Sequence, residues 1–131
     1  MAIIQIADTF SNIFEKQAEN QRNMFKKGMY YDFSDNPAID GEYTELPLDD
    51  PKLCSYHVQQ LVSEIGEVLE ADKRWKNFRN DAYDKDEKLR EIADCFIVLM
   101  NIAMFSGFDS KDVYMAICDK IEEVSIRISD C

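Results

Sequence analysis

Two stretches decide the fold of this chain, LVSEIGEVLE at residues 61–70 and KLREIADCFIVLMNIAM at residues 88–104. In both, apolar side chains recur at the spacing of an α-helix. Each stretch also carries a pair of carboxylates three residues apart, and together the pairs comprise Glu64, Glu67, Glu91 and Asp94. Because residues three apart lie on one face of a helix, each stretch predicts a helix that presents two carboxylates side by side.

These acidic pairs would converge if the two helices packed as an antiparallel hairpin. Four carboxylates cannot share a partly buried site unless a cation neutralises them. Oxygen ligands select a hard ion, so magnesium or manganese is the cofactor that the residues predict. Asp94 favours such a site, because it begins a long apolar run in which an unpaired carboxylate would be costly. The alternative is that all four residues belong to solvated faces of amphipathic helices.

A di-iron carboxylate bundle also builds a metal site from helix carboxylates, and it needs an ExxH motif on each of two helices. The only histidine is His57, and no ExxH motif is present. The usual di-iron scheme is therefore excluded, and His57 is expected at the edge of the core.

Length and charge limit the classes of function. The 131 residues predict a single domain, 1–131, with one core. The net charge of -11 argues against binding to nucleic acid or to an anionic membrane surface. The first residues lack a basic n-region and no apolar run reaches membrane-spanning length, which predicts a cytoplasmic protein, or one in the host cytoplasm if it is viral.

The whole chain reads as an all-α antiparallel bundle of about four helices with a long loop insert. Asp50-Pro51 is a helix entry, Asp84 with Glu87 another, and Asp109 a third cap. Gly28 and Gly107 are expected stops. The expected helices cover about residues 3–27, 51–77, 85–106 and 110–128, and the insert covers residues 29–49.

The third of these helices is apolar nearly all round and is therefore expected to be central. A bundle this thin cannot comfortably cover such a helix and the aromatic residues of the insert, so the residues also predict a homo-oligomer.

The string VSEIGEVLEADKRWK, followed by KLREIADCFIVLMNIA, resembles the MazG-like branch of the all-α nucleoside triphosphate pyrophosphohydrolases. That superfamily also includes the dimeric dUTPases and dCTPases. Its signature is ExxE, a variable spacer and ExxD, and here 23 residues separate Glu67 from Glu91. The resemblance covers roughly residues 53–127.

The resemblance implies a helical homodimer or homotetramer that cleaves a nucleoside triphosphate to the monophosphate and pyrophosphate with Mg²⁺ or Mn²⁺. The compact form with an insert is similar to viral and phage members that act on deoxynucleotides, including dGTP, and also to the dimeric enzymes for dUTP or dCTP. The implied metal ligands are Glu64, Glu67, Glu91 and Asp94.

Other residues are candidates for contacts with the nucleotide. The resemblance implies a phosphate contact for Lys120, and Arg127, seven residues further on, shares its helical face. Lys73 and Arg74 follow the first acidic pair and could also bind phosphate, although a solvated basic helix end is an equal alternative. Glu67 is the candidate general base for the attacking water.

Two residues are candidates for binding the base. Asn101 is expected to be buried, where its amide could read a base edge or tie two helices together. Trp75 could stack on a base or serve as a packing residue. Against all of these enzymatic roles stands a non-catalytic helical module that binds a protein partner, and the complete set of four carboxylates favours the enzyme.

Overall fold

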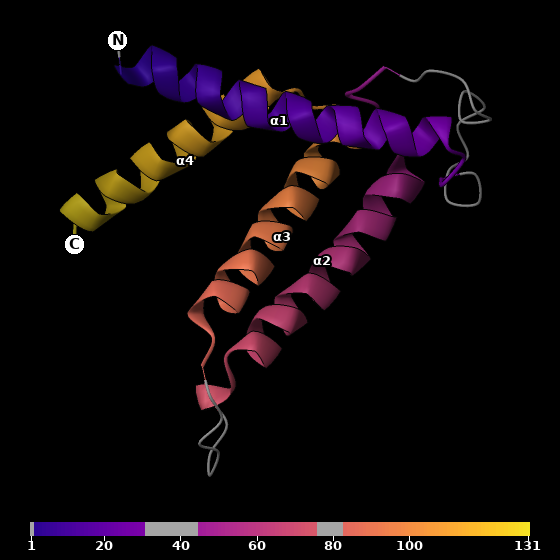
Figure 1. Cartoon of the computed structure of the whole chain (residues 1–131). Helices are drawn as coiled ribbons and strands as arrows, with labels where there is room; N and C mark the ends of the chain where they lie inside the picture. Colours follow the sequence, from indigo (N-terminus) through magenta and orange to yellow (C-terminus); the bar gives the residue numbers. More distant parts are fainter. Residues whose placement is uncertain (1, 31–44, 76–82) are drawn as a thin grey trace.

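The computed structural model describes residues 2–30, 45–75 and 83–131, and the chain within them is all-α. Four α-helices and one short 3₁₀ helix follow one another, with no strand among the described residues (Figure 1). Their bounds are α1 Ala2–Lys26, α2 Pro51–Ala71, η2 Lys73–Trp75, α3 Lys85–Met104 and α4 Ser110–Ser129.

The helices begin where the sequence predicts. Asp50 accepts a hydrogen bond from the Leu53 amide at the start of α2, and Asp84 accepts one from the Glu87 amide at the start of α3. Asp109 begins α4 with a reciprocal capping box. The stops after α1 and α3 are Gly28 and Gly107, at φ 70° and 85°, which are angles that glycine adopts without steric cost.

The end of α2 differs from the expectation. The helix was predicted to run to about Asn77, but it ends at Ala71, and Asp72 is extended at φ −123° and ψ 93°. The carboxylate of Asp72 accepts a hydrogen bond from the Arg74 amide at 3.2 Å. In a continuing α-helix, this amide would instead donate to the backbone carbonyl four residues earlier. The prediction beyond Trp75 lies outside the described residues.

The second and third helices, α2 and α3, form an antiparallel hairpin, and α1 crosses one end of it (Figure 1). The helix α4 packs against α1 and then diverges from the hairpin. Two backbone hydrogen bonds, from Leu48 to Met104 and from Asp50 to Phe105, tie the entry of α2 to the end of α3. The hairpin is therefore fixed at the end where α1 crosses it.

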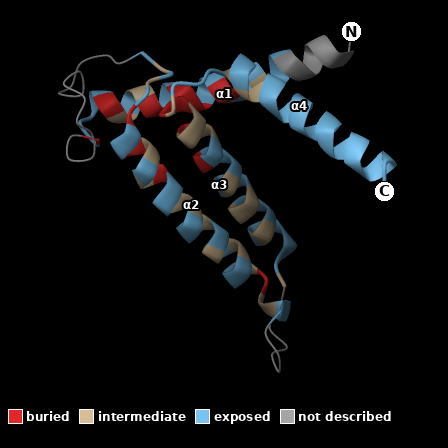
Figure 2. Ribbon diagram, turned by 180° about the vertical axis from the view of Figure 1, so that it is seen from behind, coloured by how far each residue is buried: buried red, intermediate tan, exposed pale blue. Residues whose placement is uncertain are grey.

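The core lies at this crossing, where the buried residues of Figure 2 gather along α1 and the adjoining ends of α2 and α3. His57 stacks on Phe105 with ring centroids 5.2 Å apart, and its Nε2 lies 3.2 Å from the Tyr30 hydroxyl. A second group packs Phe14 of α1 against Met104 of α3. His57 thus belongs to the core.

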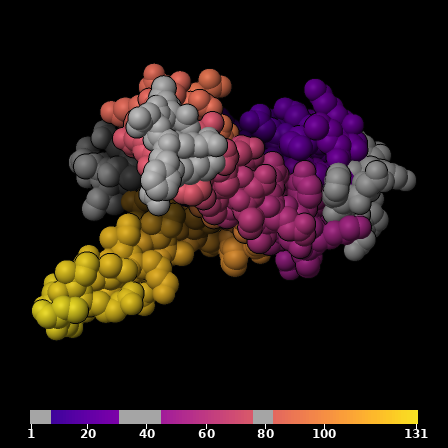
Figure 3. All heavy atoms as spheres, turned by 90° about the horizontal axis from the view of Figure 1, so that it is seen from below, coloured from indigo at the N-terminus to yellow at the C-terminus, as the bar shows by residue number. Residues whose placement is uncertain are grey.

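The expectation that the third helix is central is wrong within one chain. On α3, Leu89 and Phe96 are each 64% exposed, and only Val98, Asn101 and Met104 are buried. Figure 3 shows that the far part of α4 projects away from the rest of the molecule. The apolar pattern of α3 correctly marks surface to be covered, but this chain does not cover it.

Three aromatic residues of the predicted insert, Tyr31, Phe33 and Tyr43, lie outside the described residues. Among the helices that the structure describes, none combines the length and apolarity that crossing a membrane requires.

Candidate functional site

The antiparallel hairpin brings the two predicted acidic pairs together. Glu64 and Glu67 come from α2, and Glu91 and Asp94 from α3. One carboxylate oxygen of each residue belongs to a group whose members all lie within 4.8 Å of one another. We call these four residues the acidic cluster, and its geometry is the one expected from the spacing of the motifs.

The acidic cluster is electrostatically strained. Burial, together with Glu67 and the other neighbouring carboxylates, raises the pKa of Glu64. A hydrogen bond with Glu67, with burial and neighbouring charge, raises the pKa of Glu91. One oxygen of each of these two residues is buried without a hydrogen-bond partner among the described residues. Orphaned oxygens that face other carboxylates are suited to a hard divalent cation, so the residues fit such an ion.

A cavity of about 620 Å³ opens beside the cluster. Its lining includes Glu91 and Asp94, together with a basic residue, Arg90, that the sequence reasoning missed. The missed signal was spacing, because Arg90 lies four residues before Asp94 and so shares its helical face. The cavity therefore combines acidic cluster residues with one guanidinium.

Comparison with known proteins identifies the family. The model of the MazG nucleotide pyrophosphohydrolase domain matches residues 55–127, which is more than half of the chain and includes the whole acidic cluster. The chain belongs to the MazG family. It is accordingly a nucleoside triphosphate pyrophosphohydrolase, and its substrate is a nucleotide. Neither a curated protein nor a solved structure matched the chain.

In this MazG-family protein, Asn101 makes the helix-tying bond that was one of its two predicted roles. It is 4% exposed, and its Oδ1 accepts a hydrogen bond from Nε2 of Gln17 at 2.9 Å. The bond joins α1 to α3 within the core. A contact of Asn101 with the base stays a prediction.

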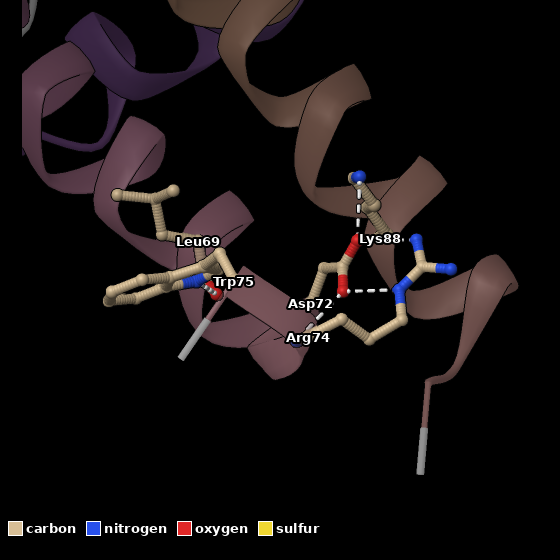
Figure 4. Close-up of polar contacts among 5 residues, drawn as sticks. All are labelled: Leu69, Asp72, Arg74, Trp75 and Lys88. Carbon is tan, nitrogen blue, oxygen red and sulfur yellow. Dashed lines mark hydrogen bonds and ion pairs between the residues drawn. The ribbon is translucent and has the colours of Figure 1, made fainter. Parts of the chain in front are cut away.

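The MazG domain holds Arg74 in an ion-pair network at the tip of the hairpin (Figure 4). Its Nε and Nη2 donate to the two oxygens of Asp72 at 2.8 and 2.7 Å, and its guanidinium lies 3.5 Å from the centre of the Tyr83 ring. Lys88 of α3 reaches the same carboxylate at 2.9 Å. Arg74 is therefore engaged by its own chain, and its phosphate contact stays a prediction.

The other candidates on this tip are Lys73 and Trp75, which share η2 with Arg74. Trp75 is 55% exposed and so partly buried, which leaves both its packing role and its stacking role open. Its indole Nε1 donates to the Leu69 carbonyl at 2.9 Å, which fixes the ring beside the end of α2 (Figure 4). An exposed and oriented aromatic face is what stacking on a base requires.

Lys120 and Arg127 lie on the exposed part of α4, which diverges from the hairpin that carries the acidic cluster (Figure 1). Lys120 pairs with Glu123 of the same helix at 3.0 Å. One chain of the MazG domain does not bring these two residues to its own acidic cluster.

Proposed function

We propose that this MazG domain hydrolyses a deoxynucleoside triphosphate, with dGTP as the first candidate, to the monophosphate and pyrophosphate. The observation that carries the proposal is the convergence of four carboxylates within 4.8 Å on one hairpin. The choice of a deoxynucleotide rests on the likeness of this compact form to viral and phage members of the family.

The acidic cluster would hold Mg²⁺ or Mn²⁺. Its buried oxygens without hydrogen-bond partners and its raised pKa values for Glu64 and Glu91 support this assignment. When bound, such an ion supplies positive charge for the triphosphate oxygens and favours ionisation of water. Glu64, Glu91 and Asp94 serve as ligands in this proposal.

Glu67 is a ligand and also the group that takes the proton from the attacking water. It is the more exposed acidic residue of α2 in the cluster, so water can reach its carboxylate. A carboxylate within reach of water can accept a proton from it as a general base. Arg90 in the adjoining cavity would donate to a phosphate oxygen, since guanidinium groups match phosphate geometry.

Trp75, through stacking on its exposed ring, and Asn101 are two separate candidates for holding the base. They lie at opposite ends of the hairpin, so one base would contact only one of them within a chain. Lys73 and Arg74 remain candidates for the distal phosphates, with Arg74 requiring release from Asp72. Lys120 and Arg127 would contact phosphate only on another copy of the chain.

A homodimer or homotetramer is part of the same proposal. Along α4, apolar residues recur at intervals of three and four, which is the spacing of a coiled-coil seam. Ile121 is 62% exposed and Ile128 is 68% exposed. A hollow of about 1180 Å³ follows this helix, and much of its lining is apolar, including Phe108, Met115, Ile117, Ile121 and Val124. Uncovered apolar surface of this kind is typical of an interface between subunits.

The test is a panel of the eight common ribo- and deoxynucleoside triphosphates plus dUTP, each with Mg²⁺ or Mn²⁺, with monophosphate and pyrophosphate resolved as products. We expect the highest kcat/KM for a deoxynucleotide, and no turnover in EDTA. Preference for dUTP or dCTP would replace dGTP with the alternative substrate of the dimeric enzymes. Release of orthophosphate instead of pyrophosphate would contradict the proposed reaction.

A further inference from the structure

The carboxylate of Asp72 accepts four hydrogen bonds from cationic and amide donors at the tip of the hairpin (Figure 4). It is 9% exposed, although it follows the last residue of a surface helix. One of its oxygens accepts from both the backbone amide and Nε of Arg74, at 3.2 and 2.8 Å. The other accepts from Nη2 of Arg74 and from Nζ of Lys88, at 2.7 and 2.9 Å. Hydrogen bonds with Arg74 above all hold the pKa of Asp72 well below its usual range.

Lys88 is the informative member of this network. It lies three residues before Glu91, so the two side chains share one face of α3. An ammonium group on that face can form an ion pair with Glu91 and so compete with a metal ion for a ligand. In the structure its Nζ is instead directed to Asp72, across the hairpin at the end of α2.

Arg74 stabilises the contact between Asp72 and Lys88. Its two-point contact with Asp72 fixes the carboxylate, and its guanidinium rests on the ring of Tyr83, just before α3. Asp72 is thereby held in one orientation toward Lys88, in the way that outer partners orient the ligands of a metal site.

We infer that Asp72 is a positioning residue that draws the ammonium group of Lys88 away from Glu91, so that all four carboxylates of the acidic cluster remain available to a divalent cation. The inference rests on the proposed function, because it takes the acidic cluster as the metal site. It assigns Asp72 and Lys88 no contact with the substrate.

The test measures Mn²⁺ binding by electron paramagnetic resonance in the absence of nucleotide, for the wild-type domain, Asp72→Asn, Lys88→Met and the double variant. With Asp72→Asn, the ammonium is released toward Glu91, and we expect the Kd for Mn²⁺ to rise by about tenfold, the scale of such outer-partner changes. Lys88→Met should bind Mn²⁺ at least as tightly as the wild-type domain. The double variant should return to within about twofold of the wild type, since no ammonium remains to compete.

The matched control is Asp86→Asn, which removes one carboxylate from the lining of the cavity beside the acidic cluster without releasing an ammonium group. If this variant weakens Mn²⁺ binding as much as Asp72→Asn, the effect is long-range charge and the inference is overturned. If Lys88→Met alone raises the Kd tenfold, the network is only a structural tie, and the inference is again overturned. No change in any variant overturns it as well.

Thermal unfolding of each apo variant accompanies the titrations. If Asp72→Asn does not fold, Lys88→Met decides: unchanged or tighter binding is the expected result, and weaker binding overturns the inference. A wild-type domain that binds no Mn²⁺ would contradict the proposed function itself, whereas Mn²⁺ binding that is insensitive to Asp72 would contradict only this inference.

Discussion

At the scale of single residues, the acidic cluster is a set of like charges held together by the packing of two helices. Raised pKa values for Glu64 and Glu91 mean that the cluster resists full ionisation without a cation. The same repulsion that destabilises the chain without metal makes the site receptive to a divalent ion. Stability and metal binding are thus opposed at these residues.

Glu67→Gln and Asp94→Asn each test this opposition. Each removes a ligand charge and keeps the side-chain volume, so turnover should fall by about 100-fold or more while the fold is retained. The melting temperature of the apo domain should stay level or rise, because repulsion is relieved. Steady-state turnover at saturating Mg²⁺ and apo thermal unfolding measure the two effects. Glu122→Gln on α4 is the control, and wild-type turnover in Glu67→Gln would refute the metal site.

His57 predicts a dependence of stability on pH. Burial lowers its pKa from 6.5 to about 4, so the folded state releases its proton more readily than the unfolded state. The contribution of neutral His57 is fully present above pH 6.5 and is lost as the pH falls from 6.5 toward 4.

Urea denaturation of the wild type and of His57→Gln from pH 7.5 to pH 4 measures this contribution. The difference between the two free energies of unfolding should shrink as the pH falls. Taking the difference removes the opposite trend of Glu64 and Glu91, whose raised pKa values favour the folded state at low pH. A difference that is constant with pH would contradict the buried neutral histidine.

At the scale of elements, helix entries were predictable and helix exits only in part. The caps at Asp50, Asp84 and Asp109 depend on local side-chain to backbone bonds, which the sequence displays directly. The end of α2 depends on Asp72 bonding to the Arg74 amide and to Lys88 of another helix. The second of these partners is sixteen residues away. No local pattern reveals such a contact.

The candidate site was likewise predictable only where local spacing along the sequence determines it. The four carboxylates were predictable because their spacing and the hairpin place them together, and their convergence was confirmed. Arg90 was not predicted, because it directly precedes the second acidic pair, whereas the predicted phosphate contacts all follow one. The central place expected for α3 was wrong, since an apolar helix pattern does not distinguish surface covered by its own chain from surface covered by another.

The buried bond between α1 and α3 gives a prediction at this scale. Gln17→Leu leaves the amide of Asn101 buried without its partner, so it should lower the free energy of unfolding by about 1–3 kcal/mol. Adding Asn101→Leu should recover part of that loss, because both polar groups are then removed. Urea denaturation of the two single variants and the double variant gives the coupling free energy. Simple additivity would contradict a direct interaction.

At the scale of the whole molecule, the chain leaves large apolar side chains uncovered on α2, α3 and α4, whose exposed residues are pale blue in Figure 2. We expect a homo-oligomer at micromolar concentration, with α4 in the interface. Ile121→Glu should shift the mass measured by light scattering toward the monomer and should leave the helical circular dichroism unchanged, because Ile121 is exposed within its own chain. Glu122→Gln, the neighbouring position, should retain the wild-type mass. A wild-type monomer would refute the proposal.

The attachment of the hairpin at one end has a further consequence. Its buried anchors, such as Leu53 on α2 and Met104 on α3, lie at the α1 crossing, whereas Glu67 and Glu91 lie toward the opposite end. The hairpin is therefore anchored at the end that α1 crosses, and it carries the acidic cluster toward its other end. Thermal stability and turnover can then be altered separately, because substitutions that improve packing at the α1 crossing leave the acidic cluster chemically unchanged.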